Sequence, residues 1–256
     1  MNQTALPEGQ GQRPPRSPVT LTVLGVVALA MVAALIGLGL WQVDRLAWKQ
    51  QLIASIDTRI HAAPVAAPGP DEWPAIKAAS HAYRRVEARG SFLHAQTSFV
   101  QAATARGSGF WVMTPLATDR GFTILVNRGF VPPEARAAIA GMRTAEPAGV
   151  TGLLRITEPG GGFLRRNDPA AGRWYSRDVA AIATAQRIDH AAPYFIDAAA
   201  NPDPAALPVS GLTVISFPNH HLGYALTWFT LAAMVIGGYM LLMRDEIRLR
   251  RAQTRS

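Results

Sequence analysis

The stretch VTLTVLGVVALAMVAALIGLGL, residues 19–40, has a counterpart near the other end of the chain in LGYALTWFTLAAMVIGGYMLLM, residues 222–243. Each contains 22 residues and no charged side chain. At a rise of 1.5 Å per residue, an α-helix of this length extends about 33 Å, slightly more than the hydrocarbon core of a bilayer. The sequence therefore predicts two membrane-spanning helices, at 19–41 and 222–243, on either side of a central segment.

The orientation of these spans follows from the basic residues at their outer ends. Arg13 and Arg16 precede the first span, and a basic tail at 244–256 follows the second. Lys and Arg next to a span favour the cytoplasmic side, so the tails at 1–18 and 244–256 are predicted to be cytoplasmic and 42–221 to be a periplasmic domain. We interpret the first span as an uncleaved anchor, because no A-x-A-like cleavage site ends it. Four prolines before it argue against a mitochondrial transit peptide, which favours a bacterial inner membrane.

Composition excludes several classes of function. The formal net charge is +8. In the central segment the basic residues are scattered, and they form a dense group only in the tail beside the second span. This distribution favours anionic lipid headgroups over nucleic acid as the partner of the basic residues. The chain has no cysteine, which excludes disulfides, thiolate metal sites, Cys-x-x-Cys-His haem attachment and thiol redox chemistry.

The central segment is long enough for one domain with its own core. Alternating or short apolar runs predict strands at 84–92, 97–102, 110–116, 122–127, 150–156, 194–197 and 212–216. The strands at 110–116 and 122–127 are predicted to form a hairpin. Helices are predicted at 133–142 and, with Asp178 as a cap, at 176–186. Two Ala- and Pro-rich stretches, 62–74 and 198–208, are interpreted as linkers. The predicted fold class is α+β, with a mainly antiparallel sheet, peripheral helices and a barrel-like closure as one option.

The candidate site lies where both spans reach the outer membrane surface. Trp41, Arg45 and Trp48 fall on one face of a helix that should continue outward and fade near residue 60. His220 and His221 open the second span, and His221, Tyr224 and Trp228 share a narrow stripe. Imidazole can ligate haem iron, a Tyr hydroxyl can orient it, an indole can stack on a porphyrin, and cations such as Arg45 can pair with propionates. The competing interpretation is an aromatic belt at the level of the headgroups.

Other chemistry has little support in the sequence. There is no H-x-x-x-H, H-E-x-x-H or G-x-S-x-G pattern, and neither span contains an internal acid or base that would support a proton pathway. The polar and aromatic loop at 165–178 suits either a partner contact or a turn fixed by Asp–Arg pairing. Ala33 and Gly37 are small residues four apart, which would allow the second helix to approach closely; the alternative is the ordinary composition of a membrane helix.

Three segments together resemble the Surfeit locus protein 1 family: LWQ at 40–42 with Arg45, Trp48, Lys49 and Leu52; VNRGF at 126–130; and NHHLGYALTWF at 219–229. The resemblance extends over 37–243. It implies two transmembrane helices around one extracytoplasmic domain, and a role in the assembly of haem–copper cytochrome oxidases. In bacterial members it also implies that haem a is held for delivery to the catalytic subunit, cytochrome c oxidase subunit I, with haem A synthase as a further partner.

The resemblance places the haem-ligand histidine at His221. The family tends to have asparagine where this chain has His220, which offers an alternative ligand. We expect a membrane assembly factor without enzymatic turnover, in which His221 contacts the iron of haem a, Tyr224 and Trp228 shape the pocket, and Arg45 pairs with a propionate. The alternative is a scaffold that stabilises oxidase intermediates without binding haem. An extracytoplasmic enzyme and a sensor are not favoured, because we find neither a catalytic constellation nor a cytoplasmic output domain in the sequence.

Overall fold

The computed structural model describes residues 13–254, apart from 143, 163, 204 and 214–218. It divides into two compact units, Met1–Leu52 with Phe217–Ser256, and Ile53–Ser216. The helices are α1 (Pro18–His61), α2 (Ala78–His81), α3 (Arg136–Ala140), α4 (Val179–Gln186) and α5 (His221–Gln253), with short 3₁₀ turns η1 (Pro70–Ala75), η2 (His94–Gln96), η3 (Pro133–Ala135) and η4 (Pro169–Ala171). The strands are β1 (Val65–Ala66), β2 (Arg85–Phe92), β3 (Ser98–Thr104), β4 (Gly107–Thr118), β5 (Thr123–Val131), β6 (Glu146–Ile156) and β7 (Ala191–Ala198).

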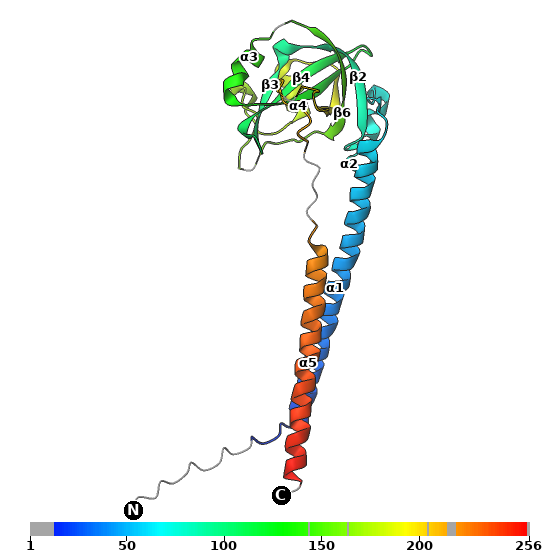
Figure 1. Cartoon of the computed structure of the whole chain (residues 1–256), viewed down its shortest axis with the longest axis vertical. Coiled ribbons are helices and arrows are strands. Elements are labelled where there is room, and N and C mark those ends of the chain that lie inside the picture. The colour runs from blue at the N-terminus through cyan, green and yellow to red at the C-terminus, as the bar shows by residue number, and fades with distance from the viewer. Residues whose placement is uncertain (1–12, 143, 163, 204, 214–218, 255–256) are drawn as a thin grey trace, which may run out of the picture. The chain divides into compact units, whose positions relative to one another are not determined.

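The two long helices, α1 with 44 residues and α5 with 33, contain the predicted spans (Figure 1). Both are long and apolar enough to cross a membrane. Helix α1 continues without a break past the apolar run and ends at His61, close to the predicted end near residue 60. Most side chains of the apolar windows are not buried within the protein, as expected of helices whose surface faces lipid.

The seven strands form one sheet in the order β1-β2-β6-β7-β5-β4-β3. Strand β2 also pairs with β4, through Gly90↔Thr118 and Phe92↔Leu116, so the five strands β2, β6, β7, β5 and β4 close into a barrel-like ring. All pairs are antiparallel except β1–β2 and β5–β7. The predicted α+β class with a mainly antiparallel, barrel-like sheet is therefore confirmed.

Local sequence patterns account for the individual elements. Strand β2 buries Val86, Gly90 and Phe92 on the face that the alternation predicted. The predicted β4–β5 hairpin forms, and Ala117 pairs with Thr123 across its turn. The Asp178 side chain accepts a hydrogen bond from the backbone N–H of Ala181 at 3.1 Å, which caps α4 as predicted.

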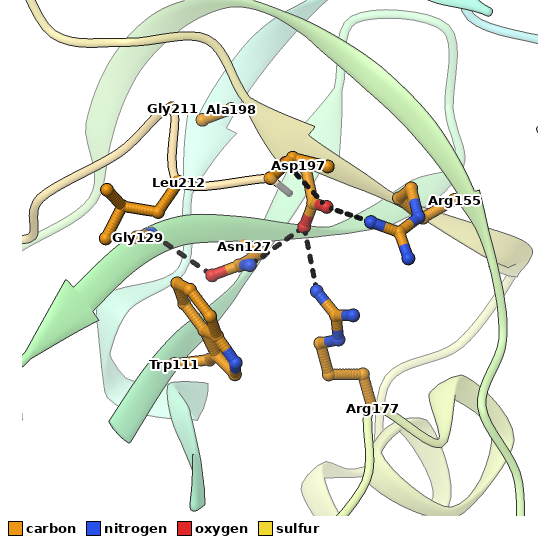
Figure 2. Close-up of a pocket in the computed structure, with 10 residues that line it drawn as sticks. Trp111, Asn127, Gly129, Arg155, Arg177, Asp197, Ala198, Gly211 and Leu212 are labelled. Atoms are coloured by element: carbon orange, nitrogen blue, oxygen red, sulfur yellow. Dashed lines mark hydrogen bonds and ion pairs between the residues drawn. The ribbon is translucent and has the colours of Figure 1, made fainter. Parts of the chain in front are cut away.

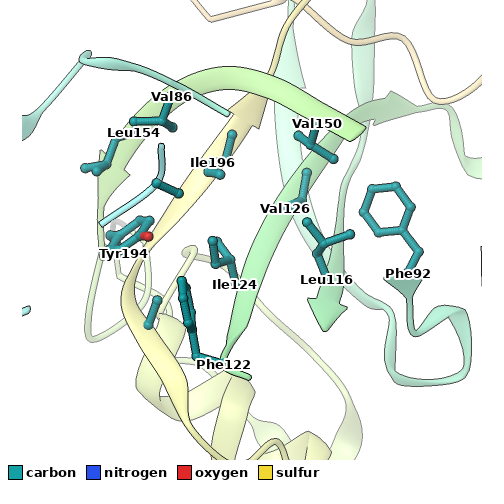
Figure 3. Close-up of a cluster of buried hydrophobic side chains, with 12 residues drawn as sticks. Val86, Phe92, Leu116, Phe122, Ile124, Val126, Val150, Leu154, Tyr194 and Ile196 are labelled. Carbon is teal, nitrogen blue, oxygen red and sulfur yellow. The ribbon is translucent and has the colours of Figure 1, made fainter. Parts of the chain in front are cut away.

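The core lies on both faces of β5. Ile124 and Val126 belong to the main cluster (Figure 3), whereas Leu125, between them, packs with Val179 and Ile182 of α4. A strand covered on both faces buries a continuous apolar run rather than an alternating one, as β5 does. The main cluster comprises Ala67, Val86, Phe92, Leu116, Phe122, Ile124, Val126, Val150, Leu154, Ala192, Tyr194 and Ile196.

The two stretches interpreted as linkers are attached to the sheet. In the first, the N–H of Ala67 donates to Glu87 O, and the buried Tyr194 hydroxyl donates to Pro68 O at 2.8 Å. In the second, the N–H of Ala199 donates to Thr151 O at 2.9 Å, and just after it Val209 exchanges two 2.8 Å backbone hydrogen bonds with Phe130. Leu212 and Thr213 are not in a strand, and 214–216 of the strand predicted there lie outside the described residues.

Candidate functional site

The helices α1 and α5 pack side by side and antiparallel (Figure 1). The sequence order of the contacts reverses between them: Gln42 meets His221, Leu21 O accepts from the Tyr239 hydroxyl, and Arg16 O accepts from Arg250. The end of α1 that follows its apolar run therefore lies beside the start of α5. This is the juxtaposition that the predicted site requires.

Two glycines bring the helices together. A Cβ on Gly39 would collide with the ring of Phe229, and one on Gly25 would collide with Tyr239. Our expectation that Ala33 and Gly37 provide this approach was wrong, because a Cβ on Gly37 would meet nothing within 4 Å and Ala33 is exposed. The apolar composition of the span gives no sign of which face of α1 meets α5, so spacing alone selected the wrong glycine.

The imidazole of His221 is held by a side chain that we did not predict as part of the site. Its Nδ1 lies 2.8 Å from Oε1 of Gln42, across the helix pair. Gln42 is only 9 % exposed, and His221 is half-buried. The sequence did offer one indication, because Gln42 is a polar residue close after the apolar run. We gave it no role because the helical face that we considered was the one with Trp41 and Arg45.

Trp228 lies two turns beyond His221 on the same face of α5. Its indole Nε1 is buried, and among the described residues it has no hydrogen-bond partner. A buried polar atom without a partner costs free energy, and a water molecule, an ion or another bound group is one way to satisfy it. Ala225, between them in the sequence of α5, is also buried.

The remaining predicted residues are less enclosed. Tyr224 is 57 % exposed, although the stripe predicted it beside His221. His220 is exposed at the N-cap position of α5, where its side chain makes no capping bond; Asn219 Oδ1 instead accepts from the N–H of His221. Arg45 is exposed on α1, and its guanidinium carbon lies 4.0 Å from the ring centroid of Trp48. Thus the structure brings His221 and Gln42 together, and leaves His220, Tyr224 and Arg45 at the surface.

A second polar cluster lies in the domain, around Asp197 at the end of β7 (Figure 2). The Asp197 carboxylate accepts from Asn127 at 2.8 Å, Arg155 at 2.8 Å, Arg177 at 3.1 Å and Thr213 at 3.0 Å. Glu158 also pairs with Arg177. The cluster borders a cavity of about 210 Å³.

The charges in this cluster balance, with Arg155 and Arg177 against Asp197 and Glu158. Burial opposes the charge of Arg177, but the bonds to Glu158 and the charge of Asp197 outweigh it, so the pKa of Arg177 is raised. A balanced and mutually hydrogen-bonded set holds strands and loops together, and offers little charge to a ligand.

The loop at 165–178 is a fixed turn. Arg173 donates to Asp168 at 2.6 Å, and Asn167 Oδ1 accepts from the N–H groups of Tyr175 and Ser176. Trp174 packs in the core beneath α4. This supports the interpretation of a turn fixed by Asp–Arg pairing, with its largest aromatic side chain facing inward. In the part of the chain that the structure describes, no three His, Cys, Asp or Glu side chains gather in a way that could hold a metal ion.

Residues 29–233 match the model of a family described as the SURF1 family. The chain is also similar to curated proteins named Surfeit locus protein 1: that of Homo sapiens is 36% identical over 230 residues, 81% of this chain and 73% of the human protein, and that of Mus musculus is 36% identical over 227 residues, 80% and 71%. A SURF1-like protein of Monosiga brevicollis is 33% identical over 233 residues, 84% of this chain and 86% of that protein.

Proposed function

The chain belongs to the SURF1 family, as its motifs predicted, and from this we propose that it is a membrane-anchored assembly factor for haem–copper cytochrome c oxidase that binds haem a and presents it to subunit I. Membership of the family suggests the role in oxidase assembly. Two apolar helices that flank a folded domain are consistent with a membrane protein. The haem step rests on the helix ends described above.

The single observation that carries the haem proposal is the contact between His221 Nδ1 and the side chain of Gln42. One ring nitrogen of His221, Nδ1, is occupied by Gln42, which leaves Nε2 as the nitrogen for iron. The surrounding residues fit such a group. The unpartnered Nε1 of Trp228 can donate to an oxygen of the bound group, and the cation of Arg45 can pair with a propionate.

In this proposal the chain binds and orients haem and performs no turnover. His221 supplies the iron contact, Trp228 and Tyr224 border the group, and His220 offers a second imidazole at the exposed start of α5. Haem A synthase is the proposed donor and subunit I the proposed acceptor, within a bacterial inner membrane. Both termini would be cytoplasmic, 42–221 periplasmic, and the basic tail would contact lipid headgroups.

The test is co-expression of the full chain with a haem A synthase, purification in detergent, and identification of the extracted pigment. We expect haem a to co-purify with the protein, His221→Ala to lose it, and the exposed control His61→Ala to retain it. His220→Ala shows whether the neighbouring imidazole contributes. A His221→Ala protein with full haem absorbance and stoichiometry would exclude the ligand assignment, whereas a wild-type protein that co-purifies with no haem would favour the scaffold.

A further inference from the structure

We propose that Gln42 is the positioning residue for His221, and that it holds the imidazole in the tautomer whose Nε2 is free to ligate iron. This inference rests on the proposed haem function and deepens it. It assigns a role to a side chain on α1, the helix opposite the ligand. The ligand site is then shared by the two helices.

The chemistry of the contact defines the tautomer. The Gln42 atom that faces Nδ1 of His221, at 2.8 Å, is the carboxamide oxygen, which accepts hydrogen bonds and cannot donate them. The proton of a neutral imidazole therefore lies on Nδ1, and Nε2 carries the lone pair. A histidine that ligates a metal through one ring nitrogen usually donates its other N–H to such an oxygen, which fixes the ring and raises its basicity.

Burial makes the contact specific. Gln42 is 9 % exposed, whereas Gln50 and Gln51, further along the same helix, are exposed. Burying a carboxamide is unfavourable unless it is hydrogen-bonded, so the hydrogen bond to the imidazole offsets the cost of burying Gln42. At this buried position little water competes for the same hydrogen bond. The exposed glutamines provide matched controls.

The helix packing sets the reach of this side chain. Gly39, three residues before Gln42, is buried against Phe229 of α5, and this approach leaves no room for a Cβ. The close approach brings the Gln42 side chain to the first residue of α5. A residue of similar length without the acceptor, such as methionine, would fill the space but leave Nδ1 without its partner.

The experiment titrates the purified full chain, in detergent, with ferric haem b supplied as hemin, and measures affinity, absorption spectrum and midpoint potential. We expect Gln42→Met to weaken hemin binding about 10- to 100-fold, the range seen when such supporting partners are removed. Gln42→Glu, which keeps an acceptor and adds negative charge, should retain affinity and lower the midpoint potential. Gln50→Met and Gln50→Glu should match the wild type.

The outcomes separate this inference from the proposed function. If His221→Ala abolishes binding while Gln42→Met matches Gln50→Met in affinity, spectrum and potential, the positioning role is wrong and the haem site stands. If His221→Ala binds hemin as the wild type does, the ligand role of His221 fails, and if the wild type itself binds no hemin, the proposed function fails. Circular dichroism and gel filtration check folding. If Gln42→Met does not fold, a Gln42→Glu protein with the same potential as Gln50→Glu also overturns the positioning role.

Discussion

The carboxylate of Asp197 lies 2.8 Å from the guanidinium of Arg155, and this pair joins the end of β7 to β6 at a site where Asp197 is only 4 % exposed. The same carboxylate also accepts from Asn127 on β5 and from Arg177, just before α4. One acidic side chain thus connects three strands of the barrel to the loop that leads into its packing helix.

We expect Asp197→Ala to destabilise the domain by about 3–5 kcal/mol, because it leaves two mostly buried arginines with only the more exposed Glu158 to balance their charge. Denaturant unfolding of the purified full chain, followed by tryptophan fluorescence, measures the change. The exposed Asp189→Asn is the control. Equal midpoints for the two variants would contradict the role given to Asp197.

Gly90 marks the closure of the barrel. An added Cβ would overlap the carbonyl oxygen of Ala117 where β2 meets β4. Gly90→Ala should therefore lower stability by about 2 kcal/mol or more, since backbone cannot move aside as a flexible side chain can.

Gly149, on the neighbouring strand β6, is a matched control, because a Cβ there would meet nothing within 4 Å. Gly149→Ala should unfold close to the wild type. The comparison uses the same denaturation assay, and a Gly90→Ala protein as stable as Gly149→Ala would show that β2 and β4 are not in close contact.

Glu246, 1 % exposed near the end of α5, accepts from the backbone N–H of Arg16 at 2.8 Å and from its side chain at 2.7 Å. We expect Glu246→Gln to weaken this attachment, so that limited trypsin digestion in detergent cuts after Arg16 several-fold faster. The neighbouring exposed Asp245→Asn should leave the rate unchanged. Equal rates for both variants would mean that the attachment does not protect the bond.

The turn at 168–173 should respond to acid. The Arg173 guanidinium, which donates to Asp168, holds the pKa of that carboxyl below its usual value, with help from the N–H of Ala171. A carboxyl whose pKa is lower in the folded state stabilises the fold above its unfolded pKa, and this contribution disappears as the pH falls through the folded pKa.

Amide hydrogen exchange in this turn, corrected for intrinsic rates, should therefore show a small loss of protection below about pH 4. In Asp168→Asn the corrected protection should be lower at neutral pH and independent of pH across this window. If the wild type shows no change on acidification, the pair contributes nothing to the turn.

Features that depend on local pattern could be predicted from the sequence. The two spans, the β4–β5 hairpin and the Asp178 cap each depend on residues within a short window. Features that depend on long-range pairing could not. The parallel pairing of β5 with β7 joins segments more than 60 residues apart, and the supposed linker at 62–74 gave no sign that it would pack on the sheet.

The candidate site also has one part that could be predicted from local sequence and one part that could not. The position of His221 at the start of α5 follows from the apolar run, and the antiparallel helices place it beside the end of the first span. Its partner Gln42 could not be chosen from periodicity, because the face of α1 that meets α5 depends on where Gly39 touches Phe229. Tyr224 shares the helical stripe with His221 but is exposed, outside the contact between the two helices.

Closure of the five strands leaves the sheet with little free edge. Among the described residues, the strands beyond the ring are β1, with two residues, and β3, whose outer side already forms a backbone hydrogen bond between Gln101 and Trp174. Exposed strand edges invite other chains to add to them and to aggregate. A sheet with so few free edges offers little surface for non-specific strand addition, and contacts with another protein would then depend on side chains and loops rather than on an added strand.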